Sequence, residues 1–202
     1  MSPKVSVLML NYNYENYIWQ AIESVLNQSF ADFEFIIIDD ASRDGSWDII
    51  QKYAKRDPRI HMYQNEINLW MHKTRNRLIE LSQCPYIAIF DSDDISLPDR
   101  INVELDFLEK NPEYGMCGSY VEVIDKTGAH IADKKFPCYN NDIRQSFFFR
   151  NPFCHSTVMI RKECFEVVWV YDESFKVAED LDMWVRIWAR YNMYNIQQNL
   201  VQ

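Results

Sequence analysis

The chain has 202 residues, of which 48% are hydrophobic and 15% aromatic, enough to fill the core of one large domain. With 21 Lys and Arg against 30 Asp and Glu, the net charge is −9, and the absence of a long basic run argues against a nucleic-acid partner. The five cysteines form no Cys-x-x-Cys pair, so reduced thiols are favoured over a zinc site or a disulfide framework.

No apolar stretch approaches the length needed to span a membrane, and the N-terminus contains no signal-peptide core. We therefore expect a soluble, cytoplasmic chain with no transmembrane segment.

The first half of the sequence alternates between strand-like and helix-like patterns. Short apolar runs predict strands at 5–10, 34–39, 60–64 and 86–90, and apolar residues at helical spacing predict helices at 18–26, 47–54 and 73–81. Alternation of this kind favours right-handed crossovers and a mainly parallel sheet. We expect an α/β fold with helices on both faces of that sheet.

The pattern changes in the second half. Pro98 suits the first turn of a helix, and the run at 117–124 with the turn after it predicts a hairpin. A further strand is predicted at 156–161 and a helix at 179–191. Both the three phenylalanines at 147–149 and the aromatic stripe of the last helix are assigned to the core. These elements indicate a smaller mixed region beside the parallel half.

Two of the predicted strands end in acidic clusters. One is followed by Asp91, Asp93 and Asp94, and another closes with Asp39 and Asp40. Ligands of open α/β sheets bind beyond the carboxyl ends of the strands, so two acidic ends suggest one site. Three carboxylates within four residues repel one another unless a cation lies among them, and hard cations such as Mg²⁺ or Mn²⁺ prefer carboxylate oxygen.

Taken in order, several segments resemble family two inverting glycosyltransferases with the GT-A fold. They lie at 5–13, 21–30, 33–42, 44–46, 86–94, 98–100, 155–159, 171–175 and 178–184. The resemblance implies a Rossmann-like GT-A domain with a nucleotide-sugar-binding half and an acceptor-side half, at 1–110 and 111–202. Relatives generally continue past the last motif, so we expect the chain to be truncated at its C-terminus.

The resemblance assigns the acidic cluster to the family's D-x-D motif. It implies that Asp93 binds Mn²⁺ or Mg²⁺ at the donor's diphosphate, while Asp91 helps to position the metal or the ribose. A metal is needed there because negative charge develops on the nucleoside-diphosphate leaving group. The alternative is an acidic turn that only caps the following helix.

The other acidic strand end is assigned to the nucleobase. Asp40 corresponds to a carboxylate that accepts a hydrogen bond from a uracil-type imide N–H, and Tyr12 corresponds to a residue that stacks on the base. Asp39 either supports Asp40 or orders the turn that follows.

Three basic residues lie on the predicted helix between the two acidic ends. Of Lys73, Arg75 and Arg77, one is expected to reach the diphosphate, and we select Arg75. This chain departs from the family just before that helix, where Leu69 and Trp70 stand in place of the usual glycine.

On the acceptor side, Glu179 and Asp180 resemble the family's late acidic motif. The resemblance implies that Asp180 is the catalytic base, while Asp182 points elsewhere on the same helix. His155 matches a histidine that is frequent in the family and is an accessory candidate.

Together these assignments predict metal-dependent transfer of a sugar, with inversion, from a UDP-linked donor to an acceptor hydroxyl in polysaccharide or glycan biosynthesis. The expected partners are a nucleotide-sugar donor and a glycan or lipid-linked sugar acceptor, which allows for peripheral association with the inner face of the membrane. Two alternatives stay open: a module that binds sugar nucleotides without turnover, and a metal-dependent phosphohydrolase.

Overall fold

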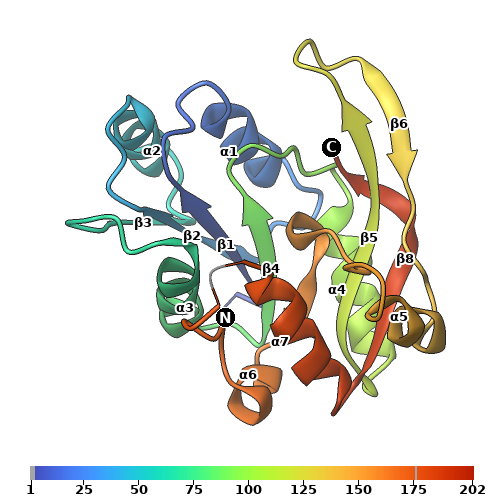
Figure 1. Ribbon diagram of the computed structural model, residues 1–202. Coiled ribbons are helices and arrows are strands. Elements are labelled where there is room, and N and C mark those ends of the chain that lie inside the picture. The colour runs from blue at the N-terminus through green and yellow to red at the C-terminus, as the bar shows by residue number, and fades with distance from the viewer. Residues whose placement is uncertain (1–2, 176) are drawn as a thin grey trace.

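The computed structural model describes residues 3–175 and 177–202, which form one mixed sheet with helices on both faces (Figure 1). The strands are β1 (Val5–Asn11), β2 (Phe33–Asp39), β3 (Ile60–Gln64), β4 (Tyr86–Asp91), β5 (Tyr114–Ile124), β6 (His130–Lys134), β7 (Met159–Arg161) and β8 (Asn192–Val201). The helices are α1 (Ile18–Leu26), α2 (Ser46–Ala54), α3 (Met71–Leu81), α4 (Arg100–Lys110), α5 (Asn140–Ser146), the 3₁₀ helix η1 (His155–Thr157), α6 (Glu163–Val168) and α7 (Glu179–Trp188). None of the helices in these described ranges has the length and apolar character required to cross a bilayer.

The predicted α/β class is confirmed by the strand order β3-β2-β1-β4-β7-β5-β6, with β8 beside β5. Strands β1 to β4 are parallel to their neighbours among themselves, whereas β7 runs antiparallel to both β4 and β5. Strand β1 lies between β2 and β4, and its register pairs Asn11 with Asp39 and Leu10 with Asp91. The two acidic strand ends therefore lie on either side of β1, at the carboxyl ends of the parallel strands.

Apolar side chains bury both faces of the parallel half. Val7 and Met9 of β1 belong to a core cluster shared with α1, α2 and α4, while Leu8 belongs to a second cluster shared with α3, α6 and α7. Figure 1 shows the two helix layers on opposite faces of the sheet. Strands buried on both sides contain nearly continuous apolar runs, which is why the sequence predicts them well.

Boundaries in the second half differ from the prediction. Helix α4 begins at Arg100, so Pro98 precedes it instead of lying in its first turn. The strand predicted at 156–161 is divided into η1 and β7, and α7 ends at Trp188. Strand β8 follows α7 and was not predicted, because polar residues such as Gln197 and Gln198 interrupt its apolar positions.

The assignment of 147–149 to the core is wrong for two of the three phenylalanines. Phe147 packs against Trp188, with ring centroids 6.3 Å apart, but Phe148 and Phe149 are 81% and 88% exposed. Three successive side chains at the end of a helix diverge, so they cannot all face one neighbour. The core assignment of the aromatic stripe is confirmed at Trp184, which is fully buried.

The loop between β4 and α4 is held by one buried amide. Gln28, just beyond α1, donates from Nε2 to Ser96 Oγ at 3.0 Å and to Leu97 O at 2.7 Å. Its Oε1 accepts from Ile101 N at 3.0 Å. A side chain from the first crossover thus fixes the segment that follows the acidic turn.

We expect Gln28→Ala to lower the free energy of unfolding by about 1–3 kcal/mol, because it leaves several buried backbone and hydroxyl groups without partners. Urea unfolding of the variant measures the loss. The control is Gln20→Ala on the exposed side of α1, which should stay within about 0.5 kcal/mol of the parent. Equal stability of the two variants would contradict the role given to Gln28.

Candidate active site

The acidic end of β2 is saturated by donors from the protein. Asp39 is fully buried and accepts from Asn11 Nδ2 at 2.8 Å and Gln64 Nε2 at 3.1 Å. Its two oxygens also bind the hydroxyl of Ser42 at 2.5 Å and the Ser42 amide at 3.0 Å. Of the two roles considered for Asp39, these contacts match the ordering of the turn.

Asp40 is anchored in the same way, but through one oxygen. Its Oδ1 accepts from Asn65 Nδ2 at 2.6 Å, from the Leu69 amide at 2.9 Å and from Thr74 Oγ1 at 3.0 Å. Within the described parts of the chain, no hydrogen-bond donor contacts Oδ2. The Asp40 carboxylate therefore connects β2 to the start of α3 through Oδ1, and its Oδ2 is left available as a hydrogen-bond acceptor.

A pocket of about 460 Å³ opens beside these two carboxylates. It is lined by Tyr12, by the turn after β2 and by the segment 64–68 after β3. The predicted stacking residue Tyr12 is thus placed in its wall. Asn65, which also lines it, was missed by the sequence analysis, although its place directly after the β3 strand was the signal available.

Asp91, at the end of β4, is surrounded by polar partners. Its Oδ2 accepts from Ser156 Oγ at 3.0 Å and lies 3.2 Å from His155 Nδ1, while Oδ1 lies 3.4 Å from Arg75 Nη2. Burial alone would raise the pKa of Asp91, but His155 and Arg75 outweigh that effect and hold the pKa well below its usual range. Asp91 is therefore a fixed negative charge.

Within the described residues, the other two aspartates of the acidic turn form no ion pair, and their pKa values shift in the opposite direction. Desolvation and the charge of Asp91 raise the pKa of Asp93, whose side chain is exposed. Burial raises the pKa of Asp94 to about 7, with Asp91 and Asp93 adding to the effect. The negative charge of Asp93 also raises the pKa of Tyr14, in the loop after β1. Asp91, Asp93 and Asp94 therefore form a cluster of like charges.

Arg75 joins the turn to the start of α7. Its Nη1 donates to Glu179 Oε1 at 2.6 Å while Nη2 contacts Asp91, and its guanidinium lies 5.7 Å from the ring centroid of Tyr171. Helix α3 begins at Met71 and brings this side chain into the site even though no glycine precedes it.

The other two basic residues of α3 lie elsewhere. Lys73 forms an exposed ion pair with Glu173 at 3.9 Å, and Arg77 donates to Asn65 beneath the pocket. The structure therefore brings Arg75, among the three candidates, together with the acidic turn.

Asp180 lies in the first turn of α7, next to Glu179. Its Oδ2 accepts from Asn151 Nδ2 at 2.6 Å, a partner that the sequence analysis did not identify. Asp182 pairs with Arg186 at 2.7 Å along the same helix, away from Asp180, as expected. His155 joins Asp91 to Tyr171, whose hydroxyl lies 2.9 Å from Nε2.

The structure is an open α/β sheet with an acidic turn and a pocket at the carboxyl ends of its strands, where ligands of such folds bind. The chain belongs to glycosyl transferase family 2, whose family model matches residues 6–169. This match confirms the predicted family, and with it the prediction that the protein is an enzyme.

Two relatives illustrate the likeness. A glycosyltransferase of Methanocaldococcus jannaschii is 34% identical over 197 residues, which cover 96% of this chain and 68% of the relative. The O-antigen biosynthesis glycosyltransferase WbnJ of Escherichia coli is 32% identical over 188 residues, or 91% of this chain and 71% of the relative.

Solved structures confirm the predicted GT-A fold. TarS 1–349 of S. aureus, in complex with UDP, superposes with a TM-score of 0.80 at 20% identity, covering 98% of this chain and 59% of that one. The mannosyltransferase PcManGT of Pyrobaculum calidifontis, in complex with GDP-Man and Mn²⁺, gives a TM-score of 0.75 at 15% identity and covers 98% and 56%. The chain thus spans somewhat more than half the length of these structures.

We expect Arg75→Ala to lower the free energy of unfolding by about 3 kcal/mol, because it leaves Asp91 and the buried Glu179 without their shared cation. Urea unfolding measures the change. Lys73→Ala, on the same helix, is the control: its pair with Glu173 is about half exposed and should contribute less than about 1 kcal/mol. Similar losses in the two variants would contradict the bridging role of Arg75.

Proposed function

We propose that this domain transfers a sugar from a UDP-linked donor to an acceptor hydroxyl with inversion at the anomeric carbon. The observation that carries the proposal is the exposed Asp93 beside the fully paired Asp91, at the edge of the sheet where the nucleotide pocket opens. Membership of glycosyl transferase family 2 supports it, and the O-antigen role in the name of WbnJ supports a place in polysaccharide biosynthesis.

The acidic turn fits a hard divalent cation. Asp93 and Asp94 offer oxygen ligands, and burial together with neighbouring carboxylates raises the pKa of each. No cluster of three His, Cys, Asp or Glu within 3–175 and 177–202 forms a complete protein cage. This is compatible with Mn²⁺ or Mg²⁺ held by Asp93 together with substrate phosphates. When bound, the metal would neutralise charge on the diphosphate leaving group.

The residues around that cation have separate tasks in the proposal. Asp91 is occupied by Arg75, His155 and Ser156, so its part is to hold the turn and set its charge. Arg75 supplies a fixed positive charge beside the diphosphate side of the site. The side chains of Asp91 and Arg75 are already held in place by these contacts, so they need not rearrange when the donor binds.

The nucleobase is assigned to the pocket beside Tyr12, where an aromatic ring can stack on it. Asp40 would accept the imide N–H through Oδ2, the oxygen that its three protein donors leave free. The complex of TarS with UDP supports a uridine donor, although PcManGT forms its complex with GDP-Man.

Asp180 is proposed as the base that takes the acceptor proton. Its place in the first turn of α7 favours the ionised form, because the helix N-terminus carries partial positive charge. Asn151 donates to Oδ2 and fixes the orientation of the carboxylate, which leaves Oδ1 toward its own helix amide at Leu181. A single in-line displacement assisted by this base inverts the anomeric centre.

We expect Asp93→Ala to weaken UDP binding in the presence of Mn²⁺ at least tenfold, or about 1.4 kcal/mol, because the diphosphate then meets the acidic turn without a metal ligand. Isothermal calorimetry with Mn²⁺ and with EDTA measures it. Asp106→Ala removes an exposed carboxylate on α4 and is the control for charge alone. UDP affinity that is undiminished in EDTA would contradict the metal-bridged donor.

We expect Asp180→Asn to keep UDP affinity but to lose about 10²- to 10⁴-fold in turnover, since a positioned base contributes that much to rate. Turnover is measured as UDP released from a panel of UDP-sugars, with water or an added glycan as acceptor. Asp182→Asn, two residues further along α7, is the matched control. If Asp180→Asn loses thermal stability but not turnover, its carboxylate is a helix cap and not a base.

A further inference from the structure

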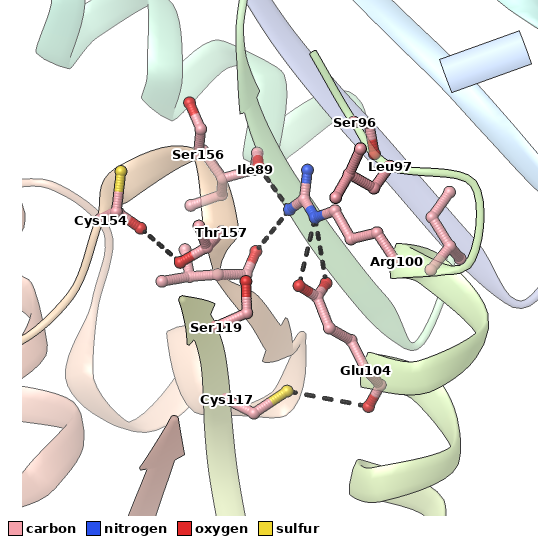
Figure 2. Close-up of polar contacts among 12 residues, drawn as sticks. Ile89, Ser96, Leu97, Arg100, Glu104, Cys117, Ser119, Cys154, Ser156 and Thr157 are labelled. Carbon is pink, nitrogen blue, oxygen red and sulfur yellow. Dashed lines mark hydrogen bonds and ion pairs between the residues drawn. The ribbon is translucent and has the colours of Figure 1, made fainter. Parts of the chain in front are cut away.

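A buried ion pair lies behind the acidic turn, outside the nucleotide pocket. Arg100 and Glu104 are one helical turn apart at the start of α4, with side chains 1% and 0% exposed. Arg100 Nε lies 3.2 and 3.3 Å from the two carboxylate oxygens of Glu104 (Figure 2). A buried ion pair often adds little to the free energy of unfolding. We therefore consider which groups this pair orients.

The guanidinium of Arg100 also holds two backbone carbonyls. Its Nη2 donates to Ile89 O at 2.8 Å (Figure 2) and contacts Val158 O at 3.5 Å. Ile89 lies two residues before Asp91 on β4. Val158 directly follows η1, which supplies two of the side chains that bind Asp91. One guanidinium thus clamps the strand that carries Asp91 to the segment that carries its partners.

Arg100 is also a buried positive charge next to the acidic turn. Glu104 keeps the guanidinium in place by binding its Nε edge, which leaves Nη2 directed at the two carbonyls.

We propose that Arg100, oriented by Glu104, is a positioning residue that sets the geometry of the acidic turn for a metal-bound nucleoside diphosphate. This inference rests on the proposed function. It assigns a task in donor binding to two residues whose side chains are almost fully buried.

The test replaces the pair by apolar residues of similar size in the double variant Arg100→Met, Glu104→Leu, which the burial of the site should tolerate. We expect a folded protein that binds UDP with Mn²⁺ at least tenfold more weakly in calorimetry. The control is Arg161→Met: Arg161 holds the Tyr114 and Asn111 carbonyls at 2.9 and 3.3 Å, at the far end of β7. This control should lose stability but keep UDP affinity.

Amide hydrogen exchange at 91–94 is the second measurement, and it does not depend on nucleotide binding. We expect faster exchange there in the double variant than in the wild type or the Arg161 control. Unchanged exchange together with unchanged UDP affinity overturns the inference. Wild-type protein that fails to bind UDP overturns the proposed function instead, and exchange still tests the positioning. If the double variant does not fold, Arg100→Lys replaces it, because lysine keeps the positive charge but lacks the planar guanidinium. We expect this variant to bind UDP more weakly and to show faster exchange at 91–94.

A separate observation concerns two exposed tryptophans with glycine-like backbones. Trp70 has φ 71° and ψ 158°, and Trp169 has φ 70° and ψ 170°, a region that is essentially restricted to glycine. Their side chains are 72% and 77% exposed, so burial does not offset the strain. The chain also has 4 glycines among 202 residues, against an average of about 7%, and 6 tryptophans.

We infer that the chain made in its own host carries glycine at positions 70 and 169. The codon TGA is read as tryptophan in some genetic codes and as glycine in others, so one difference of decoding accounts for both positions. The two codons test this: TGA is expected at both, and TGG at either one overturns the inference. Peptide masses of the protein from its host should show glycine, and a tryptophan mass at either position also overturns it.

Stability gives an independent readout of the same inference. Trp70→Gly and Trp169→Gly should each raise the urea midpoint of unfolding, because glycine adopts these backbone angles without strain. Trp19→Gly is the control, since Trp19 lies within helix α1, where glycine should lower the midpoint. A lower midpoint in both of the first two variants would contradict the glycine geometry.

Discussion

The carboxylate of Asp91 is the charge around which the site is built. It ends a buried strand, and it stays ionised because Arg75 from α3 and His155 from η1 outweigh the effect of its burial. Arg75 binds Glu179 of α7 as well, so the parallel half and the mixed half of the domain share one cation. Separating them would leave two carboxylates without a partner in a region of low dielectric, which is strongly unfavourable.

The two acidic strand ends have different physical roles. Asp39 and Asp40 receive seven hydrogen bonds from the surrounding protein, and these contacts build the rim of the pocket beside Tyr12. Asp93 is exposed and forms no ion pair within the described residues. The carboxylates at the carboxyl ends of the strands thus have two roles. Asp39 and Asp40 shape the pocket, whereas Asp93 is available to a ligand.

The sequence predicts the parallel half well because its signals are local. Strands buried on both faces have continuous apolar runs, and their acidic ends are adjacent in sequence, so both β4 and its Asp91 can be read directly. Contacts between distant segments leave no such pattern: the Arg75–Glu179 pair joins residues 104 apart, and Ser156 meets Asp91 across 65. The exposure of Phe148 and the strand β8 were not predicted, because hydrophobicity alone does not show which side chains face the core.

The donor and acceptor sides of the proposed reaction are joined through the same guanidinium. Arg75 contacts Asp91 on the donor side and Glu179 on the other, next to the proposed base Asp180. Coulomb interactions add pair by pair, so Arg75 attracts Asp91 and Glu179 at the same time. In the proposed reaction, a departing diphosphate would add negative charge near Asp91, and proton uptake would remove negative charge at Asp180. Both changes in charge would then act on the same guanidinium, because Arg75 lies between the two carboxylates.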